Sequence, residues 1–111
     1  MASGTIPNEF ADSTGTITAA SGITLDNSNC VKSGNVVSIF CQVSGDFALN
    51  GVLATLPSGF RPKQVQRLLC RYISGGNDGF YFVRVLADGT IDIRYSNTHA
   101  TQLLFSGTIV L

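Results

Sequence analysis

Few side chains in this sequence could carry out chemistry. His99 is the single histidine, and it lies in the turn-like stretch 96–101, far along the chain from any candidate nucleophile. Cys30, Cys41 and Cys70 show no CxxC spacing, whereas a structural zinc site needs three or four closely spaced Cys and His ligands. We therefore expect neither a metal site nor a cofactor.

The carboxylates form no convincing catalytic pair either. Glu9 and Asp12 fall in a polar N-terminal stretch, and Asp92 is explained by a cross-strand arginine. Asp78 lies in the glycine-rich segment 75–79, where a carboxylate helps to shape a turn. That segment has neither the calcium-loop pattern nor the lysine and helix of a phosphate loop. We expect that the protein is not an enzyme.

The overall charge excludes two classes of partner. Seven acidic residues balance seven basic ones, so no net field favours nucleic acid or an anionic membrane. The bases do cluster, at Arg61, Lys63, Arg67 and Arg71, and a solvated strand face is the simplest interpretation. No apolar segment is long enough to cross a bilayer, so we also expect no membrane insertion.

The cysteines and the first residues of the sequence indicate the cellular compartment in which the chain folds. Cys41 and Cys70 lie inside apolar runs, where thiols usually behave as small buried hydrophobes, although a disulfide between two of the three cysteines stays open. Met1 leads into a polar stretch with neither a basic nor an apolar region. We expect synthesis in a reducing cytoplasm without a signal peptide.

The elements that must position these residues are strands. Short β-rich runs alternate with turn signals at a spacing typical of an antiparallel β-sandwich or a jelly-roll-like domain. We expect a flexible or linking arm over residues 1–15 and one β-sandwich domain over residues 16–111. The expected strands cover 30–32, 36–43, 52–56 and 64–73, followed by a hairpin around 87–89 and a final strand with Leu103, Phe105, Ile109 and Leu111 on one face.

Two connections can be predicted in more detail. Segment 45–51 is expected to turn the chain so that 52–56 pairs with 36–43. Segment 56–62 is expected to be an irregular crossing between sheets, because Pro57 and Pro62 remove backbone donors.

The hairpin around 87–89 allows a choice of register. A three-residue loop with Gly89 in the left-handed conformation places Arg84 opposite Asp92, which is a favourable cross-strand pair. The same register makes one apolar face from Tyr81, Val83 and Val85 opposite Tyr95, Ile93 and Ile91. A two-residue loop would mix polar and apolar residues on both faces, so we predict the longer loop.

Several apolar residues are then left on the outer face. These are Phe82, Leu86, Leu104 and Val110. A patch of this kind is unusual on a soluble monomer, so we expect it to be covered by further copies of the chain.

One end of the domain is the best candidate for binding. In an up-and-down arrangement the 75–79 turn and the 96–101 loop lie at the same end, opposite the 87–89 turn. Aromatic rings, amides and a carboxylate gather there, and these groups contact sugars, although they also make ordinary turns. The candidate saccharide-binding residues are Asn77, Asp78, Tyr81, Tyr95, Asn97 and His99.

The segment Leu56–Pro57–Ser58–Gly59–Phe60–Arg61–Pro62 resembles the LPxG(F/Y)RP segment in C-terminal domains of many tailed-phage tail, baseplate and receptor-binding proteins. Two companions strengthen the resemblance: the strand entry Gly34–Asn35–Val36–Val37 and the hairpin Asp88–Gly89–Thr90–Ile91–Asp92–Ile93. The order and rough spacing agree with that family over about residues 22–111.

The resemblance implies a compact head at the tip of a virion tail fibre or baseplate, usually a homotrimer, which recognises saccharides on the host surface and assembles with other tail proteins. The prolines and glycine of the motif look structural, so no binding role is transferred to Arg61. No coiled coil or collagen-like shaft precedes the domain, so trimerisation would come from the faces of the head. Two alternatives stay open: a structural or decoration protein of the tail, and a glycan-cleaving tail domain.

Overall fold

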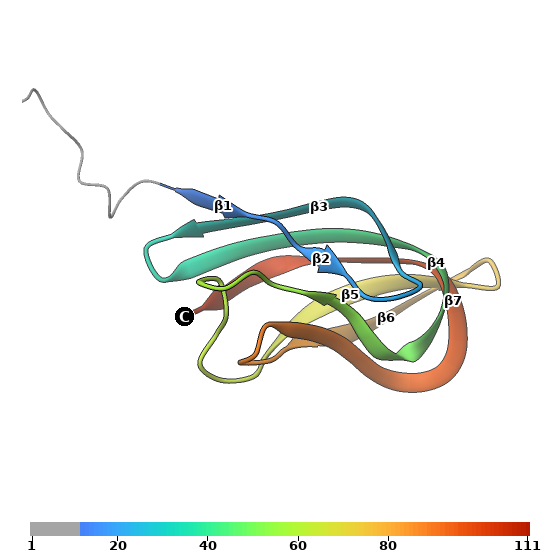
Figure 1. Cartoon of the computed structure of the whole chain (residues 1–111). Coiled ribbons are helices and arrows are strands. Elements are labelled where there is room, and N and C mark those ends of the chain that lie inside the picture. The colour runs from blue at the N-terminus through green and yellow to red at the C-terminus, as the bar shows by residue number, and fades with distance from the viewer. Residues whose placement is uncertain (1–11) are drawn as a thin grey trace, which may run out of the picture.

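The computed structural model describes residues 12–111, and within them it is an antiparallel all-β fold without a helix (Figure 1). The expected fold class is therefore confirmed. The strands are β1 (Ser13–Gly15), β2 (Thr18–Ala19), β3 (Thr24–Ser33), β4 (Val36–Thr55), β5 (Gln66–Ser74), β6 (Asn77–Val85) and β7 (Thr90–Val110).

Two very long strands, β4 and β7, take part in both layers of the fold. Their first ladder joins Val36–Ser44 to Gln102–Val110, and their second joins Asn50–Thr55 to Thr90–Arg94. Around the first ladder lies a sheet in the order β1-β3-β4-β7-β5-β6, and β2 pairs with the second half of β4. Both long strands curve from one layer into the other (Figure 1). The sandwich is thus built on one bent two-stranded ribbon.

The expected turn at 45–51 is wrong, because β4 continues through this segment. Phe47 and Leu49 point into the core with only 6% and 0% of their surface exposed, as alternate residues of a strand do. Gly45 has a φ of 133°, and the register with β7 shifts between Ser44 and Phe47, so the glycine allows a bend rather than a reversal. Segments 36–43 and 52–56 are consequently not hairpin partners, since both pair with β7.

Short pairings close the two sides of the sandwich. On one side β6 pairs with β7 at Arg84↔Asp92 and Val85↔Ile91. On the other side β1 pairs with β3, β2 pairs with β4, and the buried Ile17 lies between them in sequence.

The N-terminal arm is shorter than expected at its C-terminal end. Ser13–Gly15 pair with β3 instead of extending the arm to residue 15, while residues 1–11 lie outside the described residues. Gly15 packs so closely on Pro57 that a Cβ atom would come within 2.7 Å of the proline ring, so the pairing requires glycine there.

The two hairpins differ in how well they match expectation. At 87–89 the three-residue loop is confirmed: Leu86 N–H donates to the Thr90 carbonyl (2.8 Å), and Gly89 has a φ of 90°. The β5–β6 connection is tighter than the expected 75–79 turn. It consists of Gly75 and Gly76, with φ of 58° and 81°, so residues 77–79 belong to β6.

The irregular crossing between sheets is also confirmed, since residues 56–65 contain no strand. Arg61 Nε donates to the Leu56 carbonyl at 3.0 Å, and Lys32 Nζ donates to the Gly59 carbonyl at 2.9 Å. The first of these hydrogen bonds gives Arg61 a structural role, and the second ties the crossing to β3.

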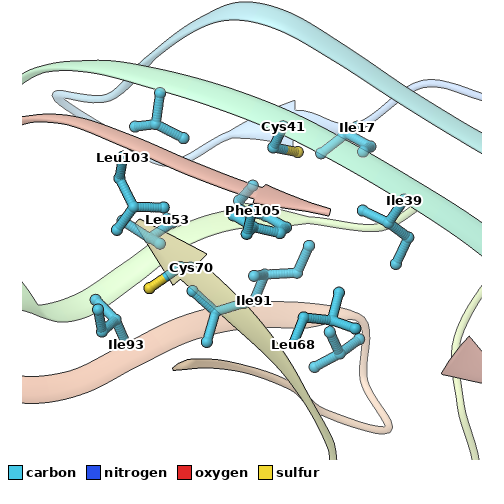
Figure 2. Packing of buried hydrophobic residues seen from close by; sticks show 14 of the residues in the cluster. Ile17, Ile39, Cys41, Leu53, Leu68, Cys70, Ile91, Ile93, Leu103 and Phe105 are labelled. Atoms are coloured by element: carbon cyan, nitrogen blue, oxygen red, sulfur yellow. The ribbon is translucent and has the colours of Figure 1, made fainter. Parts of the chain in front are cut away.

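The core fills the space between the layers. Phe105 and Leu103 of β7, Cys41 of β4, Cys70 of β5 and Ile91 lie together there (Figure 2). All three cysteines are free and buried, which confirms the interpretation of Cys41 and Cys70 as small core residues. Within residues 12–111 we find no helix that is long and apolar enough to cross a membrane.

Candidate functional site

The bends of β4 and β7 lie at the same end of the molecule as the tip of the β5–β6 hairpin, opposite the 87–89 turn (Figure 1). We call this region, formed by residues 45–51, 95–99 and 74–77, the bend end. Ser74 Oγ donates a 2.6 Å hydrogen bond to the His99 carbonyl and so joins the hairpin tip to β7. The bend end is therefore one connected surface on a two-layer scaffold.

A large bulge in β7 shapes this end. Ala48 pairs with His99 and Asn50 pairs with Arg94, so residues 95–98 of β7 face the single residue Leu49 of β4. The expected loop at 96–101 is thus wrong, because this segment is a bulged part of a continuous strand. Inside the bulge, Thr98 N–H donates to Ser96 Oγ at 3.2 Å. Residues 95–98 therefore have no ladder partner, and Asn97 and Thr98 are exposed.

A cluster of tyrosines flanks the bulge. Tyr95 is 49% exposed, and its ring centroid lies 4.5 Å from that of Tyr81 and 5.8 Å from that of Tyr72. Tyr72 in turn covers Gly79, where a Cβ atom would collide with the tyrosine ring. A hydrogen bond to Tyr95, followed by desolvation, raises the pKa of the Tyr72 phenol. The Tyr95 ring is therefore held in place from two sides while its outer part stays accessible.

Polar pairs complete the surface. His99 Nδ1 lies 2.8 Å from Asp46 Oδ1, and because a carboxylate has no proton to give at neutral pH, the imidazole must donate. Asn50 Nδ2 donates to Asn97 Oδ1 at 3.4 Å. All four side chains are exposed and keep free donor or acceptor capacity.

Four of the six residues predicted for saccharide contact, Asn77, Tyr95, Asn97 and His99, belong to the bend end, and Tyr81 flanks it through its contact with Tyr95. Asn77 lies at the hairpin tip opposite Ser74. Asp78 differs, because it faces the outer side of the first sheet and accepts a 2.6 Å hydrogen bond from Arg71.

Sequence reasoning missed Asp46, Asn50 and Tyr72. The only available signal was a polar interruption near the middle of each long strand, which is flanked by Gly45 and Gly51 in β4.

The outer face of the first sheet is partly apolar. Four large apolar side chains are well exposed there or at its rim: Leu69 (69%), Phe80 (66%), Leu104 (37%) and Val110 (52%). The predicted patch residues Phe82 and Leu86 are half-buried. A shallow groove of about 200 Å³ crosses this face, lined by Phe40, Gln42, Arg71, Ile73, Gln102 and Leu104 among others.

The bend end exposes both aromatic and polar groups. Tyrosine rings can stack on a flat apolar ligand face, and amide, imidazole and carboxylate groups can exchange hydrogen bonds with hydroxyl groups. Within the described residues no group of three or more His, Cys, Asp or Glu side chains is placed to hold a metal ion.

Comparison with known proteins gives one informative result. No family model matches the chain, and no curated protein matches it. Among solved structures, it is similar to the head domain of the lactococcal phage bIL170, described in a study of a common fold for the receptor-binding domains of such phages. The TM-score is 0.68 at 17% identity, and the match covers 89% of this chain and 97% of that domain. The likeness shows that this chain has the fold of a phage head domain.

Proposed function

We propose that this chain is the receptor-binding head of a tailed bacteriophage. It would stand at the tail or baseplate tip of the virion and bind a saccharide on the host surface without cleaving it. The observation that supports this proposal best is the fold of the bIL170 head domain combined with an exposed aromatic and amide surface at the bend end.

The bend end suits a sugar ring for physical reasons. Tyr95 offers a ring face whose position Tyr81 and Tyr72 fix in advance, so little entropy is lost when a pyranose stacks on it. Asn97 and His99 lie in and beside the same bulge and supply donors and acceptors for hydroxyl groups. Recognition groups are commonly carried in this way by irregular segments on a rigid β-scaffold.

We also propose that three copies assemble through the outer face of the first sheet. Leu69, Phe80 and Leu104 lie on neighbouring strands there, and their exposure is costly in an isolated copy. Val110 extends the patch towards the C-terminus. In the virion, other tail or baseplate proteins would hold the assembled heads.

Binding to intact cells of candidate hosts tests the saccharide proposal. Tyr95→Ala and Asn97→Ala are expected to weaken binding at least tenfold, whereas Gln64→Ala, an exposed change in the 56–65 crossing, should leave it unchanged. A head that binds no host cells but assembles with tail proteins would instead be a structural protein. Release of reducing ends from host polysaccharide would indicate a glycan-cleaving domain.

Light scattering on the purified protein tests the assembly. We expect a trimer that Leu69→Arg or Leu104→Arg converts to monomers, while Ser58→Arg, an exposed change in the 56–65 crossing, leaves the trimer intact. A wild-type monomer at high concentration would contradict the proposed assembly.

A further inference from the structure

A row of charged residues crosses neighbouring strands where β6 pairs with the first part of β7, and it lies beside the apolar patch because Arg67 and Leu69 alternate on the same outer face of β5. Arg67 of β5 lies directly opposite Arg84 of β6, Arg84 lies opposite Asp92 of β7, and Asp92 lies opposite Val52 of β4. Arg94 follows Asp92 on the same face of β7. We call Arg67, Arg84, Asp92 and Arg94 the arginine row.

The charges of this row do not balance. Asp92 is 2% exposed and accepts hydrogen bonds from Arg84 Nε (2.9 Å), Arg84 Nη2 (2.8 Å) and Arg94 Nε (3.3 Å). One carboxylate therefore serves two guanidinium groups. Within residues 12–111, Arg67 has no ion pair at all, although like charges directly opposite each other destabilise a strand pair. A chain with no net charge thus gathers two surplus positive charges on one face.

Two guanidinium groups of the row, those of Arg67 and Arg94, keep N–H groups that could bind an anion. The Arg67 guanidinium carbon lies 5.4 Å from the Phe82 ring centroid, and a guanidinium held near an aromatic ring can keep its N–H edges available. Arg94 uses only Nε on Asp92 and is 62% exposed, so its terminal N–H groups stay free. Paired N–H donors of this kind match the oxygen atoms of a phosphate.

We propose that the arginine row binds a phosphate group, carried as an ester on a sugar or polyol. A phosphate ester has the charge that the row lacks, and the half-buried Phe82 and exposed Val52 offer apolar contact for the carbon skeleton. Arg94 directly precedes Tyr95, so the Arg94 end of the row borders the bend end. The inference that the phosphate is attached to a sugar rests on the proposed function. The inference that the arginine row binds a phosphate group does not.

Titration of the ¹⁵N-labelled protein with glycerol 1-phosphate in a phosphate-free buffer tests the site. Shifts are expected to concentrate on β5, β6 and the first part of β7, with glycerol as the neutral control causing none. Arg67→Gln and Arg94→Gln should each weaken binding about fivefold or more, and Arg67→Lys should recover only part of it. Lys63→Gln removes the same charge from the exposed 56–65 crossing and should change the affinity less than twofold.

Two outcomes would overturn the inference. One is the absence of saturable shifts at millimolar glycerol 1-phosphate. The other is an equal loss of affinity in Lys63→Gln and Arg67→Gln, which would indicate a general charge effect. Because the titration uses no cells, its result is independent of host binding: a head that binds glycerol 1-phosphate but no host would contradict only the proposed function.

Discussion

Arg84 donates two hydrogen bonds to Asp92, from Nε at 2.9 Å and from Nη2 at 2.8 Å. The two residues form one of only two pairs that join β6 to β7 within the described chain, and Asp92 is almost completely buried. The ion pair therefore fastens the β5–β6 hairpin to the second layer at the point where the sandwich closes.

Removing this carboxylate should destabilise the domain strongly. Asp92→Asn leaves the partly buried Arg84 without its counter-charge, for which we expect a loss of about 2–4 kcal/mol in the free energy of unfolding. Urea denaturation measures this. Asp78→Asn is the matched control, because it breaks the exposed pair with Arg71 and should cost no more than about 1 kcal/mol. Equal losses in the two variants would contradict the structural role of Asp92.

The same pair predicts how stability depends on acid. The hydrogen bonds from Arg84, and then those from Arg94, hold the pKa of Asp92 below its ordinary value of 3.8. The folded state therefore binds this proton less readily than the unfolded state. The resulting stabilisation is complete above about pH 4 to 5 and is lost as the pH falls through the lowered pKa. Urea midpoints between pH 2 and 6 measure the loss.

A second carboxylate contributes to the acid response and supplies a comparison. The backbone N–H of Thr90 lowers the pKa of Asp88, so Asp88→Asn should remove a separate part of the pH dependence. A stability profile of Asp92→Asn that falls as steeply as that of the wild type would argue against the assignment to Asp92.

Gly89 is expected to tolerate no side chain. Its φ is 90°, and a Cβ atom would come within 2.5 Å of Arg61 Nε and 2.9 Å of the Leu56 carbonyl. Gly89→Ala should therefore cost about 2–3 kcal/mol, from backbone strain and the displacement of Arg61 together. Gly22 has a similar φ of 79°, but no atom lies close to the position that a Cβ would take. Gly22→Ala should therefore lower the free energy of unfolding by only about 1 kcal/mol. Thermal unfolding of both variants separates strain from close packing.

The thiols should be inert in the native state. Burial raises the pKa of Cys41 to about 12 and that of Cys70 to about 11, so neither ionises at neutral pH. Iodoacetamide at pH 8 should label no cysteine in the native protein and all three in denaturant, as counted by mass spectrometry. Above about pH 9 the unfolded thiols ionise while the folded ones do not, so stability should decline there. Rapid native labelling would contradict this burial.

Local chemistry explains which parts of the fold could be predicted. The 87–89 hairpin was predictable because Asp88, Gly89 and the Arg84–Asp92 pair all lie within nine residues and agree on one register. Segments 45–51 and 96–101 also contain turn-forming residues, Gly, Asp and Asn in the first and Ser and Asn in the second, yet both continue as strands. Their conformation depends on each other, since the bend of β4 and the bulge of β7 form only when the two strands pair.

In the candidate site, too, residues close in sequence could be predicted, whereas contacts between distant strands could not. Tyr95, Asn97 and His99 could be found because they are close in sequence and rich in recognition chemistry. Their partners could not: Asp46 lies 53 residues from His99, and Asn50 lies 47 residues from Asn97. No local pattern joins residues at that separation, and only the register of β4 against β7 brings them together.

The bulge in β7 has a consequence for how such a domain can diverge. The ladder is fixed by Asn50↔Arg94 before the bulge and by Ala48↔His99 after it, so residues 95–98 have almost no partners to lose. Insertions or deletions there would shift no core residue to the wrong face. The exposed contour of this end can therefore change length between related sequences while every buried layer keeps its alignment.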